Sequence, residues 1–245
     1  MASNVQLDNL AIGYRHGRTV VSSINVVFRG GELSCLIGSN GTGKSTLLKT
    51  VSGYLKPKSG CVWLVGESEK TSISSMSIHD LSRSIGIVLA KTPDISNFTV
   101  EEMVGMGRSP YTGFWGRLSA NDMDVVGRSI EAVGISRLAG RMMQTLSDGE
   151  RQKVMIARVL AQQTPVILLD EPTAFLDYSS KVELMELLRD LAHKEKKTVI
   201  LSTHDLELAI RLADRLFQIS DGRLRPVGKE EVQASMDSLL KDGNK

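Results

Sequence analysis

The sequence predicts an α/β protein in which helices cover a mostly parallel β-sheet, with an antiparallel β portion near the N-terminus and an inserted helical subdomain. Three observations carry this prediction. Apolar runs alternate with helical patterns in the last third, an apolar run over 33–37 ends in a glycine-rich loop, and the middle of the chain has a helical period. With 22 glycines and only 4% aromatic residues in 245, the composition is typical of such a fold rather than of an all-β sandwich.

The first third of the chain is predicted to be mainly strands. The run 33–37 is almost continuously apolar, which suits a strand buried on both faces. It stops at Gly38, and the glycine-rich loop that follows leads into a helix near 46–49. Further strands are predicted at 5–14, 20–28 and 60–65.

The middle of the chain is predicted to be helical. Val126, Ile130 and Val133 follow the spacing of one helix face, and Ser119 with Asp122 predicts a capping box at a helix start. We therefore expect one domain over 1–245. Its helical subdomain would span 99–162, and its α/β core would comprise 1–98 and 163–245.

The last third alternates strands and helices. Leucines at 184, 187, 188 and 191 line one face of a predicted helix, and 206–213 predicts a second one. The predicted strands are 166–169, 198–202 and 215–220, the last closed by a turn at Asp221 and Gly222.

Composition and charge exclude several classes of function. Thirty basic residues against 28 acidic ones give a net charge of +2, so we expect no nucleic-acid partner. No apolar run approaches the roughly 18 residues of a membrane span, and 1–10 shows no secretory signal. Cys35 and Cys61 lack metal-ligand spacing. We expect a soluble cytosolic protein.

The segment 38–46 fits the phosphate-binding pattern G-x-x-x-x-G-K-[ST]. Glycines let successive backbone N–H groups point into one anion-sized nest, and a helix that begins near Lys44 adds its positive end. Lys44 would reach the β- and γ-phosphates, and the Ser45 hydroxyl would ligate Mg²⁺. The expected nucleotide-binding residues of this loop are Ser39, Asn40, Gly41, Thr42, Gly43, Lys44, Ser45 and Thr46.

Two carboxylates follow the strand at 166–169, and a histidine follows the strand at 198–202. Neighbouring residues of a strand point to opposite sides, so Asp170 and Glu171 cannot share one role. We expect Asp170 to hold Mg²⁺ and Glu171 to polarise the water that attacks the γ-phosphate. His204, at the carboxyl end of its strand, would face the ligand crevice and donate to the γ-phosphate. The expected catalytic residues are thus Lys44, Glu171 and His204.

The segment 146–152, Leu-Ser-Asp-Gly-Glu-Arg-Gln, predicts a second anion site. Ser147 and Glu150 form the pattern of a capping box that opens a helix. The capping box does not explain Gly149, because glycine in a first turn costs helix stability. A bare helix N-terminus with a glycine suits an anion, so this chain would have two phosphate sites about a hundred residues apart.

Along essentially its whole length the sequence resembles the ATP-binding subunit of ABC transporters. The segment 146–152 is similar to that family's signature motif, 174–177 to its D-loop, and His204 to its switch histidine. Tyr14 stands where family members stack an aromatic ring on adenine. The resemblance implies ATP and Mg²⁺ as cofactors. It also implies a head-to-tail dimer of two copies, in which Ser147, Gly149 and Glu150 bind ATP held by the other subunit.

Two positions depart from the family pattern. Asp148 replaces the first glycine of the signature; its carboxylate would repel a γ-phosphate, so we expect it to point away. The glutamine that family members carry after the strand at 85–89 is replaced by Ala90, followed by Lys91. Neither residue is a neutral oxygen ligand, so we expect Mg²⁺ to be held at this corner by Ser45 and water.

The segment 106–111 and the helical insertion after it resemble importers of iron-siderophore, haem or cobalamin. This resemblance implies integral-membrane permease subunits, a substrate-binding protein, and a peripheral position on the cytoplasmic face of the inner membrane. Two alternatives stay open. One is a soluble ABC ATPase of iron–sulfur cluster assembly with a soluble scaffold partner. The other is a non-hydrolysing nucleotide-gated module, against which Lys44, Glu171 and His204 argue.

Overall fold

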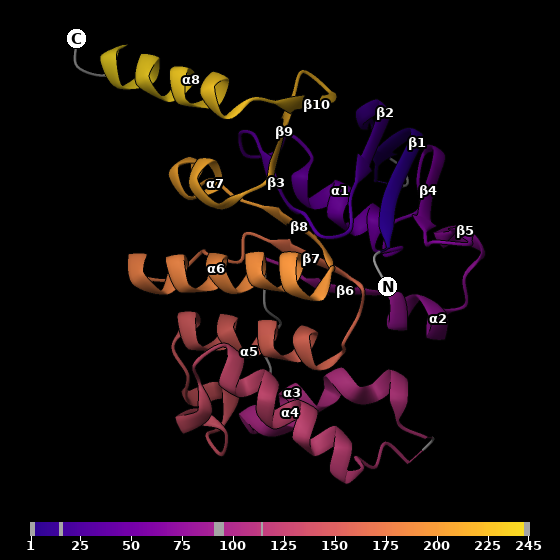
Figure 1. Cartoon of the computed structure of the whole chain (residues 1–245), viewed down its shortest axis with the longest axis vertical. Coiled ribbons are helices and arrows are strands. Elements are labelled where there is room, and N and C mark those ends of the chain that lie inside the picture. The colour runs from indigo at the N-terminus through magenta and orange to yellow at the C-terminus, as the bar shows by residue number, and fades with distance from the viewer. Residues whose placement is uncertain (1–2, 15–16, 91–95, 114, 243–245) are drawn as a thin grey trace.

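A computed structural model describes residues 3–14, 17–90, 96–113 and 115–242, with side chains described up to 238. Its centre is a six-stranded sheet in the order β10-β9-β3-β8-β7-β6 (Figure 1). All neighbours in it run parallel except β9 and β10. The strands are β3 (Leu33–Ile37), β6 (Ile85–Val88), β7 (Val166–Asp170), β8 (Thr198–Ser202), β9 (Arg215–Ser220) and β10 (Arg223–Val227).

A second, antiparallel sheet lies on one side of the central sheet, with strand order β2-β1-β4-β5. The helix α1 (Lys44–Val51) packs between the two sheets, and its apolar residues share a core with both. In that core the rings of Phe28 and Phe217 meet edge to face, with centroids 4.8 Å apart. The strands are β1 (Asn4–Gly13), β2 (Thr19–Phe28), β4 (Ser59–Val65) and β5 (Lys70–Ser72).

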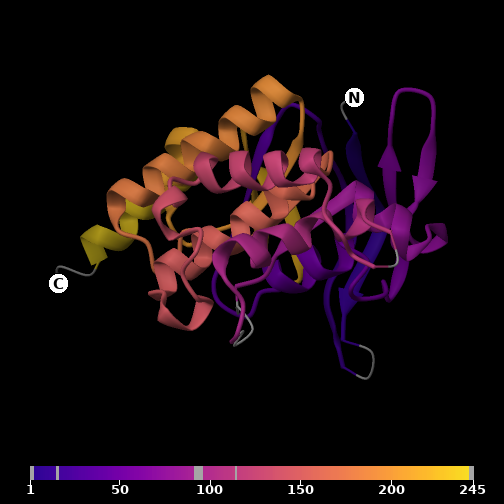
Figure 2. The same cartoon turned by 90° about the horizontal axis from the view of Figure 1, so that it is seen from below.

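The other face of the central sheet is covered by α6 (Tyr178–Glu195), α7 (Leu206–Leu212) and α8 (Lys229–Asp242), away from the antiparallel sheet (Figure 2). The strand β3 serves both cores, because Cys35 and Ile37 face one of them and Leu36 faces the other. All five residues of β3 are buried, as predicted for a strand covered on both faces.

Three helices gather at one end of the molecule: α3 (Val100–Gly105), α4 (Ala120–Ala132) and α5 (Asp148–Ala161). The capping box predicted at Ser119 and Asp122 is present at the start of α4. Two short elements, η1 (Ile73–Ser75) and α2 (Ile78–Ser84), lie between β5 and β6 and join the two sheets. Three others lie among the helices of this end: η2 (Met106–Tyr111), η3 (Ser136–Leu138) and η4 (Met143–Thr145).

The α/β class, the mostly parallel sheet and the antiparallel β portion are confirmed. The sequence patterns did not predict α2, β5, β10 or α8. None of the helices in the described part of the chain has the length and apolar content of a membrane span. Because β3, β7 and β8 are parallel neighbours, their carboxyl ends bring the 38–46 loop, Asp170 and the segment before His204 to one edge.

Candidate nucleotide-binding and catalytic site

The loop after β3 adopts a conformation that glycine permits. Gly38, Gly41 and Gly43 have φ of 147°, 79° and 116°. A Cβ on Gly38 would lie 2.6 Å from the Ile219 carbonyl oxygen, and one on Gly43 would lie 2.8 Å from Val20 Cγ1. Gly43 is the N-cap of α1, and no side chain caps that helix. Its first backbone N–H groups are therefore available to an anion such as a phosphate.

Lys44 is buried at the centre of this loop, with 6% of its surface exposed. Its Nζ donates to the carbonyl oxygens of Gly38 at 2.7 Å and Ser39 at 3.2 Å. The same Nζ lies 3.3 Å from His204 Nε2 and 4.0 Å from Glu171 Oε1. Burial lowers the pKa of Lys44, while the nearby carboxylates oppose that shift. The three residues expected to be catalytic therefore meet at one point.

The Glu171 side chain points toward Lys44 and His204, but strand alternation, the predicted cause, is not what directs it there. The strand ends at Asp170, and Glu171 has a left-handed backbone with φ of 52°, so strand alternation does not set its direction. Its Oε1 lies 2.9 Å from His204 Nε2. That oxygen is buried, and among the described residues it has no aligned hydrogen-bond donor. Burial raises the pKa of Glu171, and the charges of His204 and Lys44 counteract the rise.

The oxygen donors expected for Mg²⁺ lie on adjoining elements. Asp170 is 3% exposed, and its Oδ1 accepts a hydrogen bond from Ser202 Oγ at 2.7 Å. Ser45 is the second residue of α1, which packs on β7. No group of three His, Cys, Asp or Glu residues in the described part of the chain could hold a metal ion alone. One carboxylate and one hydroxyl suit Mg²⁺ that is also held by phosphate oxygens, so the donor set fits.

The other residues expected to bind nucleotide lie around the loop. Ser39 and Asn40 are exposed, Thr46 is buried, and Thr42 Oγ1 donates to the Ser39 carbonyl at 2.9 Å. Tyr14 follows β1 and is 52% exposed, which leaves its ring free to stack. Gly13, which precedes Tyr14, pairs with Thr19 of β2. The next residue of β2, Val20, lies against Gly43 of the phosphate loop. Ala90, after β6, carries no donor oxygen on its side chain, and Lys91 lies outside the described residues.

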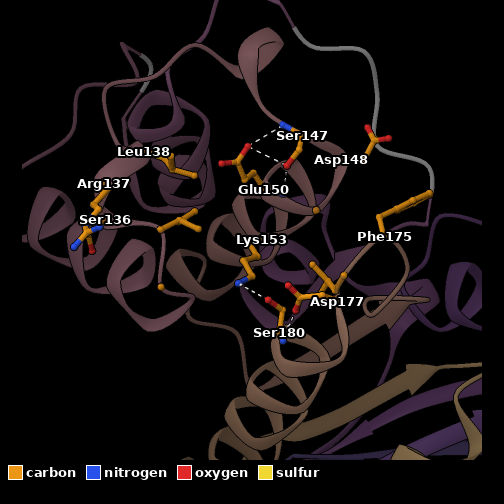
Figure 3. Close-up of a pocket in the computed structure, with 14 residues that line it drawn as sticks. Ser136, Arg137, Leu138, Ser147, Asp148, Glu150, Lys153, Phe175, Asp177 and Ser180 are labelled. Atoms are coloured by element: carbon orange, nitrogen blue, oxygen red, sulfur yellow. Dashed lines mark hydrogen bonds between the residues drawn. The ribbon is translucent and has the colours of Figure 1, made fainter.

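A cavity of about 870 Å³ lies at the start of α5 rather than at the phosphate loop (Figure 3). The predicted capping box is present: the Ser147 N–H donates to Glu150 Oε2 at 2.8 Å, and the Glu150 N–H donates to Ser147 Oγ at 3.3 Å. The Ser147 N–H and the Ser147 hydroxyl, which also donates to Oε2 at 3.0 Å, lower the pKa of the Glu150 carboxyl. The expectation that the N-terminus of this helix is bare was therefore wrong, because the side chains of Ser147 and Glu150 accept hydrogen bonds from some of its backbone N–H groups. No described contact joins these residues to the phosphate loop.

Gly149 is needed where α5 approaches the segment 174–177. A Cβ on Gly149 would lie 2.9 Å from the Phe175 carbonyl oxygen and 3.4 Å from Leu176 Cδ2. Phe175 has φ of 68° and is 68% exposed, an unusual conformation for an aromatic residue. Asp177 caps α6 by accepting from the Ser180 N–H at 2.8 Å, which fixes the end of this segment.

Asp148 forms an ion pair at the cavity, and its direction relative to a bound γ-phosphate stays a prediction. Its Oδ1 lies 3.2 Å from Nη1 of Arg151, whose Nη2 donates to the Leu146 carbonyl at 3.2 Å. Figure 3 shows the carboxylate at the edge of the cavity, apart from the Ser147–Glu150 pair. The ion pair offsets the negative charge that Asp148 places on this face.

Two structural anchors were not recognised in the sequence. Arg108, 4% exposed, pairs through Nε with Asp122 at 2.9 Å and lies over the Tyr111 ring at 4.1 Å. It gives the 106–111 segment a structural role at the junction with α4. The other is Ser202, whose contact with Asp170 is described above. A buried strand that ends in a hydroxyl residue opposite an acidic strand end is the signal that could have revealed it.

The sequence profile of the ABC transporter family matches residues 21–174. An uncharacterized ABC transporter ATP-binding protein of Methanocaldococcus jannaschii is 42% identical, over 93% of this chain and 77% of its own. The ferric enterobactin transport ATP-binding protein FepC of Escherichia coli is 38% identical, over 94% and 83%. The dimeric ATP-binding cassette MJ0796, bound to ADP and Pi in a post-hydrolysis state, superposes with a TM-score of 0.79 at 29% identity, over 92% and 98%.

Proposed function

Since this chain belongs to the ABC transporter family, we propose that it is the ATP-hydrolysing subunit that powers an importer of iron-siderophore, haem or cobalamin. ATP is its substrate and hydrolysis its reaction. The observation that carries the proposal is the convergence of Lys44, Glu171 and His204 beside an uncapped helix start. The chelate class is supported by the FepC relative and by the 106–111 segment.

Binding begins at the loop 38–46. The backbone N–H groups at the start of α1 receive the phosphates, and the ring of Tyr14 stacks on the adenine. Lys44 leaves the carbonyl oxygens of Gly38 and Ser39 and turns its ammonium to the β- and γ-phosphates, which replace them as acceptors. Mg²⁺, held by Ser45 and Asp170, supplies charge neutralisation of the phosphate oxygens when bound.

Hydrolysis requires a general base for the attacking water and an oriented hydrogen-bond donor for the γ-phosphate. Glu171 accepts the proton of the attacking water through Oε1, the oxygen that has no hydrogen-bond donor among the described residues. His204 is released from its 2.9 Å contact with Glu171 as ATP enters and donates to the γ-phosphate. The raised pKa of Glu171 makes it a better proton acceptor than an ordinary exposed carboxylate, because proton transfer follows basicity.

A second copy of this chain completes the site. The start of α5 lies apart from the phosphate loop, and it is lined by polar groups around an open cavity. In a head-to-tail dimer Ser147, Gly149 and Glu150 would meet ATP held by the partner copy, and the ATP would link the two copies. The dimeric MJ0796 cassette supports this arrangement. Asp148 stays clear of that phosphate because Arg151 holds it.

Transport requires membrane-spanning permease subunits, to which this chain would bind on the cytoplasmic face, and a substrate-binding protein would deliver the chelate. The transport name of the FepC relative favours the importer over the alternative of iron–sulfur assembly. A tagged chain should recover a polytopic membrane protein in equal proportion from detergent-solubilised membranes, with and without ATP. Recovery of soluble iron–sulfur scaffold proteins alone would overturn the importer.

A further inference from the structure

Ser202 is the last residue of β8 and lies directly opposite Asp170, the last residue of β7. It is fully buried, with 0% exposure. Its Oγ donates to Asp170 Oδ1 at 2.7 Å and accepts from the backbone N–H of Glu171 at 3.0 Å. One hydroxyl thus contacts both acidic residues of the site, and it does so with its single donor and one of its acceptor positions.

These two hydrogen bonds have different consequences. The bond to Asp170 uses Oδ1 and fixes the carboxylate, so that Oδ2 is left for another partner. The bond from the Glu171 N–H holds the backbone of a residue whose φ is 52°. A non-glycine residue keeps such a conformation only where its surroundings impose it. The Ser202 hydroxyl is one such constraint, and it comes from the neighbouring strand.

A second buried serine shows that burial alone does not create this arrangement. Ser34, on the adjacent strand β3, is 1% exposed, yet its Oγ has no hydrogen-bond partner among the described residues. The two serines lie on neighbouring strands of the same sheet and have the same size. They differ in that only Ser202 reaches the acidic residues. Ser34 is therefore a matched control for the loss of a buried hydroxyl.

We propose that Ser202 is a positioning residue for ATP hydrolysis, which aims the carboxylate of Asp170 at the cation and holds Glu171 at the angle from which it reaches the attacking water. The inference rests on the proposed roles of Asp170 and Glu171. Without the hydroxyl, Asp170 can rotate and the Glu171 backbone can relax. Neither change removes a group that binds ATP itself. The loss of the hydroxyl therefore lowers the rate of ATP turnover and the affinity for the cation.

The test compares Ser202→Ala with Ser34→Ala in steady-state ATPase assays. Loss of a group that orients a metal ligand typically lowers metal affinity or activity 10- to 100-fold. We expect about that loss in kcat for Ser202→Ala, an unchanged KM for ATP, and a higher Mg²⁺ concentration at half-maximal rate. Ser34→Ala should match the wild type. Ser202→Thr, which keeps the hydroxyl, should recover part of kcat, and Ser202→Cys, a weak donor, should recover little.

A second readout does not depend on turnover. In chains that carry Glu171→Gln, ATP-driven dimer formation can be titrated with Mg²⁺ by size-exclusion chromatography. Adding Ser202→Ala should raise the Mg²⁺ concentration that dimerisation requires, and adding Ser34→Ala should not. If Ser202→Ala unfolds, Ser202→Cys replaces it in both assays, and Ser202→Thr serves as the variant that keeps the hydroxyl.

The outcomes separate the two levels of the proposal. If Glu171→Gln turns over like the wild type, the proposed base is wrong and this inference falls with it. If Glu171→Gln is inactive and Ser202→Ala matches Ser34→Ala in kcat and in Mg²⁺ requirement, only the role of Ser202 is overturned.

Discussion

Replacing Gly149 with alanine tests the close contact between α5 and the 174–177 segment. Alanine in a helix is normally favoured over glycine by about 0.8–1 kcal/mol. At Gly149 the new Cβ would lie 2.9 Å from the backbone oxygen of Phe175, which cannot move without shifting the chain. Such overpacking costs about 1–3 kcal/mol. The balance predicts a net loss of about 0–2 kcal/mol.

Gly127 provides the control, because it lies inside α4 and a Cβ there would meet nothing within 4 Å. Gly127→Ala should therefore stabilise the folded chain by the full preference of a helix for alanine over glycine. For a chain of this size 1 kcal/mol corresponds to about 2–4 °C in Tm. Calorimetry should show Gly127→Ala about 2–4 °C above the wild type and Gly149→Ala about 0–8 °C below the wild type.

Function should separate the two variants further. Gly149→Ala should bind ATP at the phosphate loop normally, since that loop is elsewhere, but its ATP-driven dimer should be weakened because the 174–177 segment is displaced. Fluorescent-nucleotide binding and size-exclusion chromatography measure the two properties. A Gly149→Ala chain as stable as Gly127→Ala, with normal dimerisation, would refute the reasoning from this contact.

Three further changes probe the site. Burial raises the pKa of Glu171 and the charge of His204 opposes that rise, so activity should fall with acidity. His204→Ala should move that fall to higher pH in a kcat/KM–pH profile, which reports the free enzyme in which His204 still contacts Glu171. An unmoved acid limb would contradict this. Ala90→Gln should raise ATPase activity at low Mg²⁺ by restoring an oxygen ligand; no change would remove the idea of a missing ligand. Asp148→Gly should leave the affinity of the ATP-driven dimer within about 2-fold of the wild type, because Arg151 holds the carboxylate clear of the partner's phosphate, and a dimer tightened about 5-fold or more would contradict this.

Local patterns in the sequence predicted the elements that carry the chemistry. The strands at 33–37, 198–202 and 215–220 have the predicted bounds, because a short segment rich in apolar residues and flanked by a helical pattern or a turn signal leaves little freedom. The capping boxes at Ser119 and Ser147 were visible because their hydrogen bonds connect residues three apart.

What the sequence could not show depends on contacts between distant residues. The direction of Glu171 follows from a left-handed backbone held by Ser202, thirty-one residues away. The role of Arg108 depends on Asp122 and on the Tyr111 ring, which the fold of η2 and α4 brings together. Likewise, the need for Gly149 arises from the backbone of Phe175. The periodicity of apolar residues along one sequence contains no information on these contacts.

In the proposed mechanism Glu171 activates water on ATP that joins two copies of this chain. Glu171→Gln keeps the size of the side chain and removes its basicity, so binding stays intact while turnover stops. Size-exclusion chromatography of this variant with ATP should show a stable dimer that is absent without nucleotide, while the wild-type dimer decays as ATP is hydrolysed. If the variant and the wild type dimerise and hydrolyse ATP alike, Glu171 is not the base and the account is wrong.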